Sequence, residues 1–216
     1  MSLLLENKRF RFNIILFILN FIYIFIIGLF TDKNNLSGVY YITISLIYFF
    51  STLTVEKDHR WGKHLYFPLL IVMLLWVGFF LDLPNLVKIT GFLSTFFFFV
   101  VIIFMVIQIS KSKKIGSLEF LEAVNIYLLF GIAASILFKI IYTMNSTSLE
   151  SSIQDFKTRA DFIYFAFVTI TTLGYGDVLP ASPAARSITI FFSVAGQLYL
   201  TMIIAMLVGK YLNEKK

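Results

Sequence analysis

Residues 171–177, which read TTLGYGD, carry the most unusual chemistry in this sequence. Two glycines flank one tyrosine, a composition that suits neither a helix nor a strand, yet strongly apolar segments lie on both sides. In a membrane, irregular backbone is tolerated only where protein buries it or where it lines a water-filled path. The sequence therefore predicts a non-helical segment whose carbonyl groups need a partner outside their own backbone.

A cation can be that partner. Glycine reaches positive-φ conformations that other residues avoid, so Gly174 and Gly176 allow neighbouring carbonyls to turn toward one side. Rings of backbone carbonyls that replace the hydration shell of an ion are a known device for ion selectivity. The alternative is a plain glycine turn between two membrane helices, which needs no ligand.

Residues 172–176, TLGYG, resemble the selectivity-filter signature of the potassium channel family. Leu173 departs from the TVGYG form at a position that contributes a carbonyl, and its side chain is expected to pack behind the filter. The surrounding order also resembles the pore region of that family: a long helix, a polar outer segment, a short helix, the motif, an Asp and a long helix. The chain is similar to prokaryotic six-helix members that lack a charged voltage-sensor helix.

The resemblance implies a role for each residue of the motif. The filter residues would be Thr172, Leu173, Gly174, Tyr175 and Gly176. The first four would bind potassium through their backbone carbonyls, and Thr172 would add its hydroxyl. Support for the filter would come from Thr171, Tyr164 and Asp177, with the Tyr164 hydroxyl able to donate a hydrogen bond to Asp177. No resident cofactor is expected, because potassium is the permeant ligand.

The apolar run at residues 161–170 is too short to span a bilayer and is predicted to be a re-entrant pore helix. Together with Thr171 it would aim its C-terminal end at the ion path. A helix C-terminus carries about half a negative elementary charge, which favours a cation there. Because one chain supplies one filter strand, a closed pore implies a homotetramer.

The sequence departs from the family pattern behind the filter. Relatives often have two tryptophans where this chain has Tyr164 and Phe165, and Phe165 cannot donate a hydrogen bond. Val168 replaces a carboxylate found in some members. Gly196 falls where the gating-hinge glycine of the family lies, although a small residue there would equally suit close helix packing. These changes concern filter rigidity and gating more than potassium selectivity.

The composition indicates an integral membrane protein. Of 216 residues, 59% are hydrophobic and only 14% are charged, whereas about 25% charged residues is usual in a soluble domain. The apolar residues gather in blocks long enough to cross a hydrocarbon core of about 30 Å. The blocks are residues 12–30, 39–55, 65–81, 91–109, 118–143 and 184–211. We expect an all-α membrane protein with six transmembrane helices, a re-entrant pore helix and a filter loop.

The placement of Lys and Arg predicts that both termini are cytoplasmic, because cytoplasmic segments of membrane proteins carry an excess of these residues. This orientation leaves six of the 18 basic residues at outer ends and loops: Lys33, Lys88, Lys139, Lys157, Arg159 and Arg186. A multi-pass protein of the plasma membrane is expected. The net charge of +6 is explained by these topology signals, so we expect no nucleic-acid partner.

Two domains are predicted: a four-helix peripheral domain over residues 1–117 and a pore domain over residues 118–216. Voltage-gated relatives carry arginines along their fourth helix, because moving one charge through the field contributes about 2.3 kcal/mol per 100 mV. The block at residues 91–109 contains no charge, so no voltage sensing is expected. The peripheral domain would be a scaffold around the pore, or it would contact lipid or an unidentified regulatory partner.

The sequence as a whole favours a passive, potassium-selective channel that conducts through a tetrameric filter of backbone carbonyls and is not voltage-gated. A weakly selective cation channel on the same fold and a non-conducting regulatory subunit remain alternatives. A potassium transporter with pore-like repeats would carry four degenerate filter segments in one chain, and this chain has one. The sequence shows no arrangement of a nucleophile with a base and no cysteine, so an enzyme is not expected.

Overall fold

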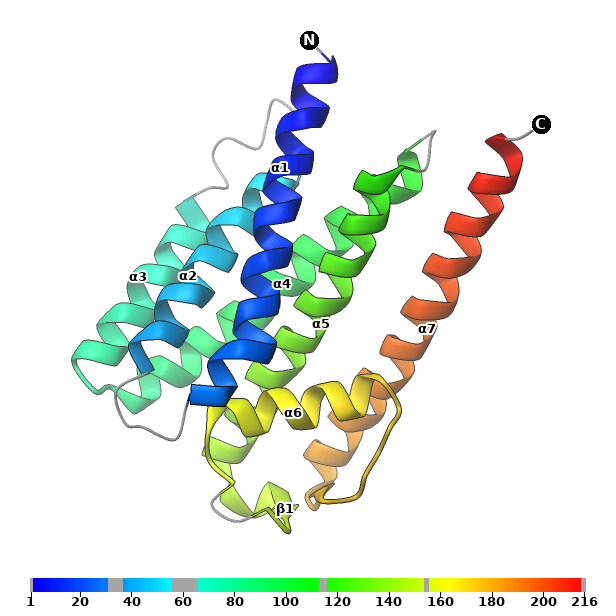
Figure 1. The fold of residues 1–216 in the computed structure, drawn as a ribbon. Helices are drawn as coiled ribbons and strands as arrows, with labels where there is room; N and C mark the ends of the chain where they lie inside the picture. The colour runs from blue at the N-terminus through cyan, green and yellow to red at the C-terminus, as the bar shows by residue number, and fades with distance from the viewer. Residues whose placement is uncertain (1, 31–36, 56–65, 113–115, 154–155, 215–216) are drawn as a thin grey trace.

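The computed structural model describes residues 2–30, 37–55, 66–112, 116–153 and 156–214, and it is almost entirely helical (Figure 1). The α-helices are α1 (Ser2–Phe21), α2 (Ser37–Thr54), α3 (Tyr66–Phe80), α4 (Pro84–Lys111), α5 (Ser117–Met144), α6 (Arg159–Ile170) and α7 (Pro183–Glu214). A π-helical turn, η1 (Ile22–Ile26), and a 3-10 turn, η2 (Ile27–Phe30), prolong α1. A second 3-10 turn, η4 (Ser146–Ser148), follows α5.

The long helices occur where the apolar blocks of the sequence lie. Four segments are long and apolar enough to cross a membrane: Asn7–Leu29, Pro84–Lys111, Ser117–Met144 and Pro183–Gly209. The chain is therefore a helical membrane protein. The apolar helices α2 and α3 are shorter, so the expected total of six spans stays a prediction for these two.

Two helices begin well before their predicted apolar blocks: α1 begins at Ser2 rather than near residue 12, and α4 begins before residue 91. Helix α4 begins at Pro84, well before the apolar block at residues 91–109, so Lys88 lies inside the helix rather than before it. Proline suits the first turn of a helix because its φ angle is already helical and its missing N–H is not needed there. The turn before it contains Asp82 at φ 48°. A count of apolar residues does not extend to residues 84–90, so it could not place the start of α4.

A single hydrophobic core joins the N-terminal helices to the C-terminal ones. Helix α4 lies along α5 (Figure 1), where the rings of Phe99 and Phe130 meet edge to face with centroids 6.1 Å apart. At Gly91 the two helices are so close that an added Cβ would lie 2.7 Å from Cδ1 of Ile140. The boundary predicted between residues 117 and 118 falls at the start of α5 and stays a prediction.

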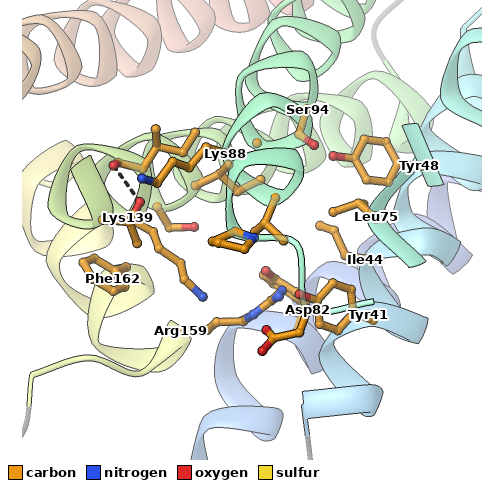
Figure 2. A pocket seen from close by; sticks show the side chains of 18 residues that line it. Tyr41, Ile44, Tyr48, Leu75, Asp82, Lys88, Ser94, Lys139, Arg159 and Phe162 are labelled. Carbon is orange, nitrogen blue, oxygen red and sulfur yellow. Dashed lines mark hydrogen bonds between the residues drawn. The ribbon is translucent and has the colours of Figure 1, made fainter. Parts of the chain in front are cut away.

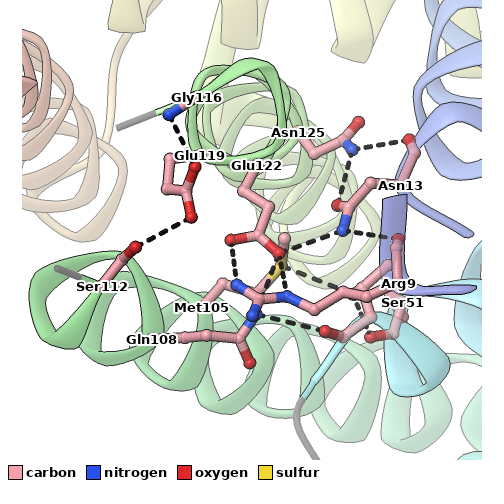
Figure 3. A network of polar contacts seen from close by, with 11 residues as sticks. Arg9, Asn13, Ser51, Met105, Gln108, Ser112, Gly116, Glu119, Glu122 and Asn125 are labelled. Carbon is pink, nitrogen blue, oxygen red and sulfur yellow. Dashed lines mark hydrogen bonds and ion pairs between the residues drawn. The ribbon is translucent and has the colours of Figure 1, made fainter. Parts of the chain in front are cut away.

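A buried polar cluster holds α1, α4 and α5 together near the starts of α1 and α5 (Figure 3). Its centre is Glu122, which is fully buried and accepts hydrogen bonds from Nε and Nη2 of Arg9 at 2.6 Å each. Gln108 donates to Oε1 of Glu122 at 2.9 Å, and Asn13 donates to it at 3.1 Å. Asn125 then donates to the carbonyl of Asn13 at 2.9 Å. Arg9 therefore does more than mark topology.

Both termini lie at the same end of the bundle, and the start of α6 and strand β1 (Leu149–Ser151) lie toward the other (Figure 1). Strand β1 pairs antiparallel with β2 (Val178–Pro180), so that Leu149 lies opposite Pro180. This small sheet ties the segment after α5 to the segment after residues 171–177. The sheet therefore fixes the position of the chain directly after residue 177.

Candidate ion-binding segment between α6 and α7

Helix α6 is anchored at both ends, and its orientation determines where the TTLGYGD segment begins. At its start Thr158 and Asp161 form a capping box: the Thr158 hydroxyl accepts from the Asp161 N–H at 3.3 Å, and the Asp161 carboxylate accepts from the Thr158 N–H at 2.7 Å. Further along, the Phe165 ring packs against Phe138 of α5 with centroids 4.6 Å apart. An added Cβ at Gly131 of α5 would overlap the Phe167 ring, so the two helices are in tight contact.

The chain leaves α6 with its N–H groups still bonded to the last turn of the helix. The Thr171 hydroxyl donates to the Phe167 carbonyl at 2.6 Å. The N–H of Thr172 donates to the Thr169 carbonyl at 3.0 Å, and that of Leu173 donates to the Val168 carbonyl at 3.1 Å. Within the described parts of the chain, no hydrogen-bond donor reaches the carbonyls of residues 172–176. The N–H groups of Thr172, Leu173 and Gly174 are therefore bonded to the end of α6, while the carbonyls of residues 172–176 accept no hydrogen bond from the described residues.

The backbone of the segment alternates in handedness. Thr172, Gly174 and Gly176 have φ angles of 61°, 56° and 80°, while the residues between them have negative φ. Successive carbonyls of an ordinary strand point to opposite sides, and a regular alternation of φ sign brings them toward one side. A non-glycine residue such as Thr172 at positive φ is uncommon and often marks a functional site.

The two glycines are required by conformation and not by crowding. A Cβ added at Gly174 or Gly176 would meet no atom within 4 Å, but both φ angles lie in the region that favours glycine. Any side chain there would strain the backbone even though it has room. The two glycines thus allow the backbone conformation of residues 172–176, whose carbonyls we call the carbonyl row.

Asp177 fixes the outer end of the segment. The Tyr164 hydroxyl donates to its carboxylate, as expected from the sequence, and the Val178 N–H donates to the same carboxylate at 3.1 Å. The Ser152 N–H donates to the Asp177 carbonyl at 2.9 Å. The hydrogen bond to Asp177 raises the pKa of Tyr164 to about 12. That these residues support a filter stays a prediction.

The segment is exposed on the isolated protomer. Leu173 is 58% exposed and Tyr175 66% exposed, although the Tyr175 ring also stacks on that of Tyr164 at 6.5 Å. Its own chain offers no wall at that place, so the expectation that Leu173 packs behind the filter stays a prediction that requires neighbouring protomers. By contrast, Phe165 and Val168 on α6 are buried.

Helix α7 leaves a long apolar face exposed as well. The exposed large side chains on it are Ile190, Phe191, Val194, Leu198, Met202, Ile204, Val208 and Leu212. Gln197 and Thr201 are exposed on the same helix, and the Thr201 hydroxyl bonds back to the Gln197 carbonyl at 2.9 Å. A surface of this kind needs either lipid or further copies of the chain to cover it.

Gly196 lies where α7 crosses the end of α6. An added Cβ there would be 2.7 Å from the Ile170 carbonyl oxygen. The Tyr127 hydroxyl reaches that oxygen at 3.4 Å, and the Tyr199 hydroxyl donates to the Ala123 carbonyl at 2.6 Å, which ties α7 to α5. Helix α7 is continuous through Gly196. This contact explains a glycine by packing, and its role as a gating hinge stays a prediction.

Sequence reasoning did not identify the polar cluster around Glu122. A signal was available, since Glu122 is an acid within the apolar block at residues 118–143 and such a residue needs a buried partner. The partner could not be chosen from the sequence, because Arg9 is 113 residues away.

Residues 124–213 match the ion channel family. The chain is 27% identical over 108 residues to two-pore potassium channel 4 of Arabidopsis thaliana, covering 50% of this chain and 35% of that protein. It is 36% identical over 93 residues to a voltage-gated potassium channel of Aeropyrum pernix, covering 43% of this chain and 28% of that one. It is 39% identical over 54 residues to two pore potassium channel c of Oryza sativa subsp. japonica, covering 25% and 12%.

The matched parts span about a third or less of each relative's length. No solved structure is significantly similar to this chain. The family is one of channels rather than enzymes, and the potassium channels among the relatives agree with the motif at residues 172–176. Residues 124–213 thus match the model of the ion channel family, and parts of the chain are similar to potassium channels.

Proposed function

We propose that this chain is the subunit of a passive, potassium-selective channel that conducts through residues 172–176. The observation that carries the proposal is the row of open carbonyls at residues 172–176, on a backbone of alternating φ whose first three N–H groups are bonded to the end of α6. Carbonyls that face no donor at membrane depth require a cation or water. Thr172, Leu173, Gly174 and Tyr175 are the proposed potassium ligands, and Gly176 completes the outer mouth.

The short helix supports cation binding electrostatically. Its C-terminal end stops at Ile170, directly before the carbonyl row, and Thr171 caps it. The partial negative charge of a helix C-terminus attracts a cation placed beyond it. In the proposed pore, the open carbonyls and the C-terminal end of α6 would both act on the same ion.

A homotetramer is proposed because one chain supplies only one row of carbonyls. A fourfold ring would surround an ion with acceptors, and a cyclic arrangement closes on itself. The exposed sides of Leu173 and Tyr175 and the exposed apolar face of α7 offer surface for such contacts. In the tetramer, residues 118–216 would form the pore and residues 1–117 the periphery.

We further propose that voltage does not gate the channel, because α4 carries no charged residue between Lys88 and Lys111. The membrane is proposed to be the plasma membrane, with both termini in the cytoplasm, in keeping with their position at one end of the bundle (Figure 1). A regulatory partner for the peripheral helices stays open.

One observation favours a weakly selective cation channel as the second candidate. Behind the segment, Phe165 is turned into the core against Phe138 and offers no hydrogen-bond donor. Tyr164 then provides the pore-helix hydrogen bond to Asp177. A filter held by fewer donors would deform more easily and discriminate less between cations.

The test is the reversal potential of purified protein in planar bilayers with opposed potassium and sodium gradients. A value near the potassium equilibrium potential supports the proposal. A value near zero with robust current replaces it by the weakly selective channel. An absence of current in a preparation shown to be tetrameric would favour a non-conducting regulatory subunit.

A further inference from the structure

A cavity of about 300 Å³ lies where the N-terminal helices meet α5 and the first turn of α6 (Figure 2). Its walls are mostly apolar and include Ile44, Leu75, Ile136 and Phe162. The hydroxyl of Tyr48, a fully buried residue that also lines the cavity, has no hydrogen-bond partner among the described residues. The cavity thus combines apolar walls with one buried hydroxyl group, that of Tyr48, which lacks a hydrogen-bond partner among the described residues.

Three basic side chains line this space: Lys88 of α4, Lys139 of α5 and Arg159 of α6. They are three of the six basic residues that the sequence leaves on the outer side, where positive charge is disfavoured as a topology signal. The fold brings together charges that lie far apart in the sequence. Because outer segments usually carry few basic residues, the grouping of these three indicates a role other than setting the membrane topology.

The cavity contains too little negative charge to balance these three. Asp82 is the acid that lines it, which leaves a formal charge of +2 from three bases and one acid. In the described part of the chain, no carboxylate forms an ion pair with Lys88, Lys139 or Arg159. Asp161, two residues after Arg159, is occupied by the capping box of α6.

The position of Lys139 makes the excess positive charge in the cavity energetically unfavourable. It lies five residues before the end of α5 at Met144, about 8 Å below the helix end at 1.5 Å per residue. Figure 2 shows Lys139 and Arg159 extending into the same space, with Asp82 beside Arg159. The Arg159 guanidinium rests on the Tyr41 ring at 4.2 Å, which orients it without neutralising it. Two neighbouring cations at this depth repel one another unless an anion lies between them.

We propose that the cavity binds the phosphate of an anionic phospholipid, with Lys139 and Arg159 as the principal ligands and Lys88 as a third charge. Phosphate accepts several charge-assisted hydrogen bonds, and arginine suits it in particular. The apolar walls accommodate the glycerol and the first part of an acyl chain. A free phosphate ion shares the headgroup chemistry but would leave the apolar walls unused.

The site also joins two parts of the molecule. Its ligands come from α4, α5 and the first residue of α6, so a bound phosphate would fasten the start of the short helix to the peripheral helices. The site is independent of ion conduction, and its test needs no current.

The experiment is native mass spectrometry of the detergent-purified protein with added phosphatidylglycerol or phosphatidylcholine. We expect phosphatidylglycerol to be retained in preference to phosphatidylcholine, one molecule per chain. Lys139→Gln and Arg159→Gln should each weaken its retention by about tenfold or more, since each removes a charged ligand. The matched control is Lys157→Gln, which removes an exposed charge from the same outer region and should leave retention unchanged.

Lys139→Arg should restore retention while Lys139→Gln does not, which separates a loss of ligand charge from a loss of fold. Equal retention by Arg159→Gln and the control would overturn the proposal, as would equal retention of the two lipids. Displacement of the lipid by excess inorganic phosphate would overturn the lipid assignment in favour of a free phosphate ion.

Discussion

The carbonyl row at residues 172–176 and the polar cluster around Glu122 lie in different parts of the molecule and are built in opposite ways. The row is exposed on the protomer, and its acceptors meet no donor among the described residues. In the cluster, Glu122 is fully buried and is bonded by Arg9, Asn13 and Gln108. One region leaves its polar groups open and the other closes nearly all of them.

The difference separates polar groups that bind a ligand from polar groups that hold a fold. A buried network in which each charge has partners fixes the helices that contribute to it. A row of backbone acceptors without donors, with Thr172 at positive φ, does not stabilise the chain that contains it, and so it requires another explanation. Changes in the row should therefore alter ion selectivity, and changes in the cluster should alter stability.

The largest effect is expected from Gly174→Ala. Alanine in the left-handed region costs about 1–2 kcal/mol. In a tetramer, each of the four chains that form one pore would carry this strain. We expect the potassium reversal potential to move to near zero, or the current to disappear, while the thermal unfolding temperature falls by less than in Glu122→Ala. Gly209→Ala is the matched control, since Gly209 also has no atom within 4 Å of an added Cβ but lies in regular helix. Retained potassium selectivity in Gly174→Ala would show that another segment selects the ion.

The next effect in size concerns the cluster and should appear in stability. Glu122→Ala leaves the Arg9 guanidinium without its carboxylate, and breaking a buried pair costs about 3–5 kcal/mol. The 17% exposure of the Arg9 side chain should reduce this cost somewhat. We expect a clear drop in the unfolding temperature of purified protein, with the selectivity of the remaining folded channels unchanged.

Two variants control this prediction. Glu150→Ala removes an exposed acid from β1 and should leave the unfolding temperature as it is. The double variant Arg9→Met with Glu122→Leu should recover much of the stability, because apolar residues of similar volume often replace a buried ion pair without loss. If Glu122→Ala were as stable as Glu150→Ala, the cluster would not hold α1 to α5.

The two regions also differ in how far the sequence could predict them. The carbonyl row follows from a contiguous motif, and α6 follows from an apolar run too short to cross a bilayer. The pairing of Arg9 with Glu122 depends on which faces of α1, α4 and α5 meet. Much of this chain is apolar on every side of its helices, so periodicity does not reveal the inward face. The gathering of Lys88, Lys139 and Arg159 was hidden for the same reason.

Gly196→Ala tests the contact between α7 and the end of α6, with an expected effect of about 1–3 kcal/mol, the usual cost of overpacking. The new methyl group would press on the Ile170 carbonyl at the end of α6. We expect both a lower unfolding temperature and a reduced potassium preference in the bilayer measurement. A hinge role predicts something else: an unchanged unfolding temperature and a lower open probability. Gly209→Ala again provides the control on the same helix.

The smallest effect is expected from Tyr164→Phe, which removes the hydrogen bond to Asp177 and keeps the ring that stacks on Tyr175. The site is partly exposed, so the loss should be about 1 kcal/mol. We expect faster decay of the potassium current, with Tyr142→Phe as a control because no hydrogen bond of the Tyr142 hydroxyl is found among the described residues. An unchanged decay would mean that the bonds of Asp177 to the N–H groups of Val178 and Ser152 suffice to hold the outer end. The loss of a second donor at Phe165 would then carry no penalty, and the case for weak selectivity would lose its support.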